Sequence, residues 1–232
     1  MKLKTFYTTL LFFAMSSAAI ASVDSVENDL TKCLKNRYLS YDMICCTEKA
    51  SDSCIAELSK FAQNSTEAKI NQTYWNNYKQ STSVAIISHL KEAHGTMYHE
   101  FASSTTYEIN KNRLIILNYL YNNADYKREK YLSDDLKNCL NHGDASKCYI
   151  TTANKYKSEI NDMLNDLKAN LSQKDYQSLM KNQSDWNKYY QNTITLSSKL
   201  GELKKSQITK LLLEERKSQL YMIQVYAEYI KS

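Results

Sequence analysis

The stretch that decides the fold runs from Cys139 to Tyr190 and begins Cys139-Leu-Asn-His-Gly-Asp-Ala-Ser-Lys-Cys148. After Cys148, apolar side chains recur at steps of three and four residues, which places them on one face of a helix about five turns long. Then follow Leu171-Ser-Gln-Lys-Asp175 and Asn182-Gln-Ser-Asp-Trp186-Asn-Lys-Tyr189. The apolar stripe consists of Ala153, Tyr156, Ile160, Leu164, Leu167 and Leu171.

The last of these pieces also occurs earlier in the chain. Asn71-Gln-Thr-Tyr-Trp75-Asn-Asn-Tyr78 aligns without a gap with Asn182 to Tyr189, and an N-cap pattern precedes each copy, Asn64-Ser-Thr-Glu67 and Ser172-Gln-Lys-Asp175. This self-similarity predicts a tandem duplication of one helical unit. The residues that we expect to act as structural anchors in the core are Trp75, Trp186, Gln72, Gln183 and Leu164.

The composition predicts an all-α protein. The 232 residues contain no proline and three glycines, and a hydrophobic content of 43% is enough for a buried core. We expect two tandem, related helical-bundle units stapled by disulfides, over residues 22–125 and 126–232. The polar, turn-prone segment Asn122-Asn-Ala-Asp125 is the predicted boundary.

The expected helices follow from periodicity and from cap and stop signals. They are a helix pair over residues 24–46 broken near Arg37 to Tyr41, a short helix carrying Cys54, a helix from the Asn64 cap to about Ala93, one from Tyr98 to about Tyr121, one capped by Ser133, and a closing arm from Lys199 to Ile230. Gly95 and Gly201 are expected to mark a stop or kink.

The first 21 residues resemble a cleavable signal peptide. Lys2 and Lys4 form a charged start, an apolar run follows, and Ala19-Ile20-Ala21 is a small-x-small cleavage pattern. A membrane anchor is the alternative, but the apolar run is shorter than the roughly 20 residues that a span needs. No cysteine follows the cleavage pattern, so the sequence lacks a lipobox. We therefore expect a periplasmic or secreted bacterial protein with no membrane span after removal of the signal.

Six cysteines in an exported chain predict three disulfides, with a structural zinc site as the alternative. Cys139 and Cys148 bracket a short loop, and a bridge between them would hold one helix end against the next. The pairing among Cys33, Cys45, Cys46 and Cys54 stays open. Cys45 and Cys54 are nine residues apart, about 13 Å along a continuous helix, so they can pair only if the chain turns between them.

The charge pattern offers little to nucleic acid or to anionic membranes. The formal net charge is +5, the predicted mature chain without Lys2 and Lys4 carries +3, and no concentrated basic run occurs. The sequence has no Gly-rich phosphate loop, nucleophile elbow or plausible Ser-His-Asp set, so we expect no enzyme and no cofactor. Glu214-Glu215 followed by Arg216-Lys217 is expected to form a solvated helical face.

Three of the four histidines, His89, His94 and His99, lie close together. Metal sites on a helix favour histidines four residues apart, but these are five apart, so each is rotated by about 140° from the last. We expect no metal site, and a metal-binding protein that uses this cluster is kept as an alternative because Gly95 could bend the chain to gather the three side chains.

The second half resembles the LprI-like lysozyme-inhibitor domain family of bacterial exported proteins. The resemblance rests on Cys139, Cys148, Leu164, Leu171-Ser172, Gln183 and Trp186, covers about 55 residues, and is more degenerate in the first half. It implies a non-catalytic binder that inhibits lysozyme or another peptidoglycan hydrolase. Family members usually carry an Arg-Asp-type pair soon after the tryptophan, where this chain has Tyr189-Tyr190-Gln191.

Two surfaces are candidates for contact with a protein partner. The first is the loop between Cys139 and Cys148, because a short constrained loop loses little entropy on binding. The second is a tyrosine-rich face that includes Tyr74 and Tyr78, which would suit a periplasmic protein-interaction or envelope-stress module instead. The predicted contact residues are Asn141, His142, Asp144, Lys147, Tyr189 and Tyr190.

Overall fold

The computed structural model describes residues 23–35, 40–61, 65–92, 95–122 and 132–229. This described part is built of helices and contains no strand, so the predicted all-α class is confirmed. The predicted signal segment lies outside it, as do most of the predicted boundary and Ile230. Among the described helices, none is both long and apolar enough to cross a bilayer.

The first half begins with a helix over residues 23–34, which is followed by α2 (Ser40–Leu58) and α3 (Thr66–Thr82). α3 continues through a π-helical turn, η1 (Ser83–Ile87), into α4 (Ser88–Glu92), and α5 (Thr96–Asn122) completes this half. The helix predicted from the Asn64 cap to about Ala93 is therefore a run of three consecutive elements. The separate short helix expected around Cys54 is wrong, because α2 passes through Cys54 without a break.

The second half contains α6 (Asp134–His142), α7 (Ala145–Asn170) and α8 (Gln173–Ser197). A single 3-10 turn, η3 (Ser198–Leu200), leads to the long α9 (Glu202–Tyr229). The expected closing arm is confirmed over the described residues, with its apolar stripe buried at Leu213, Leu220, Ile223 and Ala227.

Side-chain caps fix where several helices begin. The hydroxyls of Ser65, Ser133 and Ser172 and the carboxylate of Asp144 each accept a hydrogen bond from the backbone N–H three residues further on. Such a bond satisfies one of the N–H groups that a helix start leaves unpaired. The caps expected at Ser133 and Ser172 are confirmed, and in the first half it is Ser65 that caps α3.

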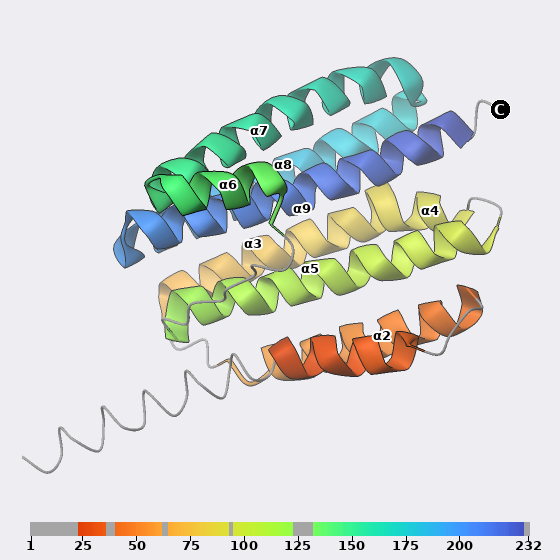
Figure 1. Cartoon of the computed structure of the whole chain (residues 1–232). Helices are drawn as coiled ribbons and strands as arrows, with labels where there is room; N and C mark the ends of the chain where they lie inside the picture. The colour runs from red at the N-terminus through yellow and green to blue at the C-terminus, as the bar shows by residue number, and fades with distance from the viewer. Residues whose placement is uncertain (1–22, 36–39, 62–64, 93–94, 123–131, 230–232) are drawn as a thin grey trace, which may run out of the picture.

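The helices form three tiers (Figure 1). α6, α7, α8 and α9 make the upper tier, α3, α4 and α5 the middle one, and α2 with the N-terminal helix the lower one. α7 packs on α9, α2 on α5, and α3 on α8, so the two halves of the sequence meet along the α3–α8 contact. One large apolar cluster fills the upper and middle tiers. A smaller cluster of Val26, Ala50, Cys54 and Tyr107 attaches the lower tier to α5.

Both predicted tryptophan anchors lie in the large cluster. Trp75 on α3 is 6% exposed and Trp186 on α8 is 4% exposed. The predicted stripe on α7 is buried at Ala153, Ile160 and Leu167, while Leu164 is partly buried against the same cluster. The tandem relationship and the boundary near residue 125 stay predictions, although the contacts between the halves, described next, are reciprocal.

Candidate functional site

The interior of the α3–α8 contact contains two arginines that sequence reasoning missed. Arg113 on α5 and Arg216 on α9 are 2% and 0% exposed. Arg113 donates through Nη1 to Asn71 Oδ1 at 2.5 Å and through Nη2 to Gln72 Oε1 at 2.8 Å, and its guanidinium lies 5.5 Å from the Trp75 ring centroid. The predicted anchor Gln72 therefore works together with Asn71 as an acceptor for a buried cation.

Arg216 makes the same set of contacts in the second half. Its Nη1 donates to Asn182 Oδ1 at 2.6 Å, its Nε donates to Gln183 Oε1 at 2.8 Å, and its guanidinium lies 5.9 Å from the Trp186 ring centroid. Two neutral amides and an aromatic face satisfy part of the hydrogen-bonding and electrostatic demand of a buried guanidinium. The Asn-Gln-x-x-Trp pattern therefore binds an arginine from a later helix in each half.

The amide nitrogens of the two asparagines reach across to the opposite half. Asn71 Nδ2 donates to Thr193 Oγ1 at 3.0 Å, and Asn182 Nδ2 donates to Thr82 Oγ1 at 2.9 Å. Each α3 contact thus has an α8 counterpart with the roles exchanged. Such exchange is typical of two similar segments packed about a local two-fold axis.

A buried carboxyl completes this polar interior. Glu215 is 7% exposed and accepts hydrogen bonds from the Tyr78 hydroxyl at 2.8 Å and from Asn112 Nδ2 at 2.9 Å. Burial raises the pKa of Glu215 to about 7, although these two hydrogen bonds oppose the rise. Burial also lowers the pKa of the adjacent Arg216 to about 10.

These positions correct the expectation that Glu214 to Lys217 form a solvated face. Arg216 and Glu215 point into the core, and Lys217 pairs with Glu159 on α7 at 2.6 Å. The apolar period of α9 continues through Leu213 and Leu220, and Arg216 lies between them on the same buried side. A charged residue in phase with an apolar stripe is a sequence signal for a buried charge, and Arg216 shows it. Arg113 shows the same signal among the apolar residues of α5.

The prediction of an exposed tyrosine-rich face is wrong for Tyr78 and Tyr189. Tyr78 and Tyr189 are 0% and 1% exposed, so neither can offer a surface to a partner. Tyr190 is partly buried and stacks on Trp186 at 4.9 Å between ring centroids. Tyr78 and Tyr189 lie in phase with the apolar residues of their helices. This periodicity is a stronger signal than the preference of tyrosine for binding patches.

The predicted loop between Cys139 and Cys148 forms an exposed, covalently closed corner between α6 and α7, at the left end of the upper tier in Figure 1. The two cysteines are disulfide-bonded with their Cα atoms 5.7 Å apart. A side chain at Gly143 would meet Cys139 O at 3.0 Å and Cys148 Sγ at 3.4 Å, so the close turn favours glycine there. We call this segment, residues 139–148, the α6–α7 corner.

The four predicted contact residues of the α6–α7 corner are all exposed. Asp144 has a structural task as well, since its carboxylate accepts from Lys147 N at 2.9 Å and caps α7. Asn141, His142 and Lys147 point from a backbone that is held on both sides by helix ends. The corner therefore presents amide, imidazole, carboxylate and ammonium groups on a backbone that the disulfide closes.

The cysteines differ in part from the prediction. Cys33 pairs with Cys46, Cα atoms 5.8 Å apart, but Cys45 and Cys54 carry free thiols. The expectation of three disulfides is wrong because α2 is continuous from Cys45 to Cys54, so the chain makes no turn that could bring them together. Cys54 is buried and its pKa is raised to about 12 by burial.

The histidine cluster is only partly described, since His94 lies outside the described residues. His89 lies 3.5 Å from Asp175 and stacks on Tyr226, whereas the exposed His99 borders a groove between α2 and α5. Within the described ranges, no group of three or more His, Cys, Asp or Glu side chains is arranged to hold a metal ion.

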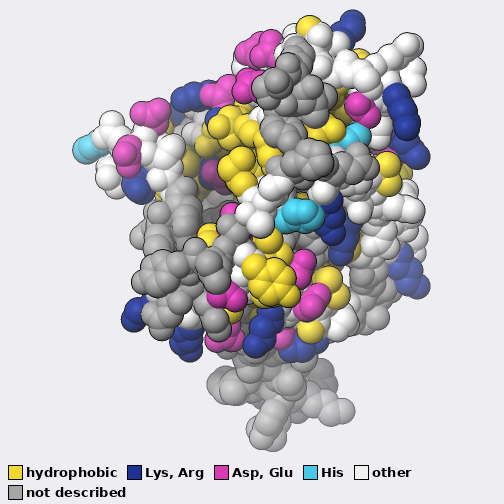
Figure 2. Space-filling model, turned by 90° about the vertical axis from the view of Figure 1, so that its right-hand side faces the viewer, with side chains coloured by type: hydrophobic (Ala, Val, Ile, Leu, Met, Phe, Trp, Pro, Cys, Tyr) yellow, Lys and Arg dark blue, Asp and Glu magenta, His cyan; other side chains and the backbone are white. Residues whose placement is uncertain are grey.

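On the face at the right of Figure 1, the side chains of the described residues form no patch of a single charge. Figure 2 shows Lys and Arg side chains interspersed with Asp and Glu over this face, with hydrophobic side chains near its centre. The mixed signs agree with the small net charge of the sequence. An association steered mainly by long-range charge is not favoured on this face.

Comparison with protein-family models, with curated proteins and with solved structures found no match to this chain.

Proposed function

We propose that this chain is an exported, non-catalytic binding protein that inhibits lysozyme or another peptidoglycan hydrolase. The observation that carries the proposal is the α6–α7 corner, where exposed polar groups are held by a disulfide and by the ends of two helices. The resemblance of the second half to the LprI-like family supplies the class of target. The small net charge of the sequence favours recognition by shape and hydrogen bonds over charge.

Rigidity is the physical reason why the α6–α7 corner suits a binder. A loop that is already fixed loses little conformational entropy when a partner covers it, so more of its contact energy becomes affinity. The cap of α7 by Asp144 and the close approach at Gly143 fix the backbone further. An exposed loop closed by a disulfide suits a concave partner surface, such as the substrate cleft of a hydrolase.

The experiment is a lysis assay with the disulfide-intact protein and lysozymes of several classes. We expect stoichiometric inhibition of at least one class. The triple variant Asn141→Ala/His142→Ala/Lys147→Ala should raise the inhibitor concentration needed for half inhibition by tenfold or more. Unchanged lysis at a large excess of protein would reject the proposal for the enzymes tested.

The control variant changes three exposed residues on the same helix away from the corner. Asn154→Ala/Lys157→Ala/Asn161→Ala removes similar side chains from the exposed side of α7. We expect it to inhibit as well as the original chain. An equal loss in both variants would mean that the corner is not the contact element.

A further inference from the structure

A cavity of about 220 Å³ lies between α5 and α9 and shares no residue with the α6–α7 corner. α5 lines it with residues at steps of three and four, including Phe101, Thr105 and Asn112. α9 lines it in the same way, including Glu215 and Met222. Such spacing places each set on one helix face, so the cavity runs between two facing stripes.

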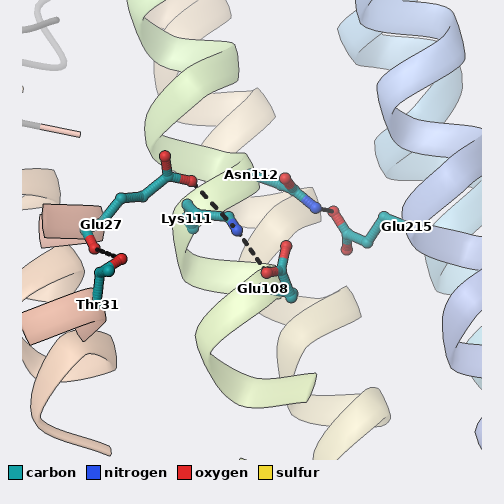
Figure 3. A network of polar contacts seen from close by, with 6 residues as sticks. All are labelled: Glu27, Thr31, Glu108, Lys111, Asn112 and Glu215. Carbon is teal, nitrogen blue, oxygen red and sulfur yellow. Dashed lines mark hydrogen bonds and ion pairs between the residues drawn. The ribbon is translucent and has the colours of Figure 1, made fainter. Parts of the chain in front are cut away.

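Asn112 lines the cavity and carries a buried hydrogen-bond acceptor that has no donor among the described residues. Asn112 is 3% exposed, and its Nδ2 donates to Glu215 Oε2 at 2.9 Å (Figure 3). Its Oδ1 makes no hydrogen bond with any described residue. Because Nδ2 must face the carboxylate, the amide cannot turn to hide this oxygen. A buried acceptor left in this way points to a donor that the chain itself does not supply.

Glu215 adds a second acceptor beside the first. Its Oε1 accepts from Tyr78, and its Oε2 accepts only from Asn112 among the bonds formed by described residues, so one lone pair of Oε2 remains. Burial raises the pKa of Glu215 to about 7, while its hydrogen bonds with Tyr78 and Asn112 and the charge of Arg216 oppose this rise.

The charged side chains that line the cavity are acidic, and the lysines that pair with them do not line it. Glu108 and Glu214 also line it, while the residues that line it include no lysine or arginine. Lys111 pairs with Glu108 and lies 3.6 Å from Glu27 on the N-terminal helix, which draws it away from α9 (Figure 3). Lys210 pairs with Glu214 at 2.8 Å.

The end of the cavity away from Asn112 is apolar, and its opening is polar. Phe101 and Met222 are partly buried at the end of the cavity away from Asn112, one from each helix. Ser104 and Ser218 are exposed and mark the opening. The cavity thus combines buried oxygen acceptors with an apolar wall.

We propose that this cavity binds the ammonium end of a small primary alkylamine, with the ammonium between Asn112 Oδ1 and Glu215 and the alkyl chain along Phe101 and Met222. An alkylammonium has three donors and no acceptor, which matches the two buried oxygen acceptors at Asn112 and Glu215. Its chain removes apolar area of both walls from water. This site is independent of the proposed inhibition, since the inhibitor assay uses neither α5 nor the inward face of α9.

The test titrates the intact protein with n-butylamine and follows backbone and side-chain amide signals by NMR. We expect saturable shifts that include the Asn112 side-chain amide, and at least tenfold weaker binding of 1-butanol, which has the same chain and no charge. Equal binding of amine and alcohol would overturn the proposal.

Two variants locate the site. Asn112→Leu removes the acceptor, and Ser218→Phe fills the opening from an exposed position at which the fold is not at risk. Both should weaken butylamine binding at least tenfold. Ser158→Phe, an equally exposed serine on α7, is the matched control and should bind normally. Binding that survives Ser218→Phe, or that Ser158→Phe abolishes as well, would overturn the assignment.

A second probe distinguishes the source of the amine. Nα-acetyl-lysine methylamide carries the same ammonium and chain as the side chain of a polypeptide lysine. Saturable binding of this probe that Ser218→Phe removes would assign a protein lysine as a natural ligand. Its failure beside successful butylamine binding would assign free amines. Failure of both probes would overturn the proposal.

Discussion

Tyr78 and Tyr189 stack at the centre of the α3–α8 contact with ring centroids 5.6 Å apart and an angle of 13° between their planes. They occupy matching positions after the two tryptophans, so each half contributes one ring to the contact. Their surroundings differ. Tyr78 donates to Glu215 and lies within hydrogen-bonding distance of Gln219 on α9, and Arg113 lies over the Tyr189 ring at 5.6 Å.

The Tyr78 hydroxyl should contribute measurably to stability. Tyr78→Phe keeps the ring stack and removes the donor to Glu215, so we expect the free energy of unfolding to fall by about 1–3 kcal/mol. Urea unfolding followed by tryptophan fluorescence measures this. Tyr190→Phe is the control and should change it by less than about 0.5 kcal/mol. Equal effects of the two changes would contradict the role assigned to the Tyr78 hydroxyl.

The two buried arginines should have similar energetic weight. Arg113→Met and Arg216→Met each leave an asparagine and a glutamine oxygen unpaired in the core, and at about 1–3 kcal/mol for each oxygen the free energy of unfolding should fall by about 2–6 kcal/mol. The exposed Lys181→Met is the control. Because the halves exchange hydrogen bonds at Thr82 and Thr193, both variants should shift one common unfolding transition. Separate transitions by circular dichroism and fluorescence would show that the halves unfold independently.

Glu215 should make stability depend on pH in an unusual direction. Its pKa of about 7 in the folded chain exceeds the ordinary 4.5, so the folded state binds more protons between these values. Its contribution is therefore complete below about pH 4.5 and is lost as pH rises through 7. Glu215→Gln removes this pH dependence. The difference in free energy of unfolding, variant minus original chain, should therefore rise by about 3 kcal/mol between pH 4.5 and pH 8.

Urea unfolding of both proteins at several pH values measures that difference, and other titrating groups cancel because they are common to both. Glu214→Gln, which changes a partly exposed carboxylate paired with Lys210, is the control. A constant difference in unfolding free energy between the Glu215→Gln variant and the original chain would contradict the assigned pKa.

The thiol count should distinguish two disulfides from three. The native, unreduced protein should react with one equivalent of a maleimide at the exposed Cys45, and the unfolded, unreduced protein with two. Cys54 reacts only after unfolding because burial both covers its sulfur and raises its pKa to about 12. Cys45→Ser should remove the native reaction. An unfolded chain with no reactive thiol would restore the third disulfide.

Local signals in the sequence predicted the elements well. Serines at helix starts, glycines at the two reversals and the near absence of other breakers gave the helices almost in full. The π-helical turn after α3 was not predictable, because it depends on tertiary packing of Ala85, Ile86 and Ile87 and not on local preference. The continuity of α2 was missed because the polar run from Thr47 to Ser53 resembled a turn.

The interior of the candidate region was harder to predict than its surface. The α6–α7 corner follows from two cysteines and a glycine close in sequence. The arginine contacts join Gln72 to a residue 41 positions away and Gln183 to one 33 positions away, so no local pattern contains both partners. Residue type also favoured the wrong expectation for this interior, since arginine, glutamate and tyrosine are more often found at the surface of a protein than fully buried.

The two arginine contacts form although the connecting segments between their partners differ in length. Gln72 and Arg113 are 41 positions apart, whereas Gln183 and Arg216 are 33 positions apart, eight fewer. The arginine reaches its amide pair in both halves, so the segments that connect α3 to α5 and α8 to α9 differ in length without loss of the contact. Gly95 and Gly201, with φ of 103° and 91°, reverse the chain there, and a side chain built at either would meet no atom within 4 Å. Insertions and deletions at these two hairpins should therefore be tolerated, and grafted peptides or reporter tags are best placed there.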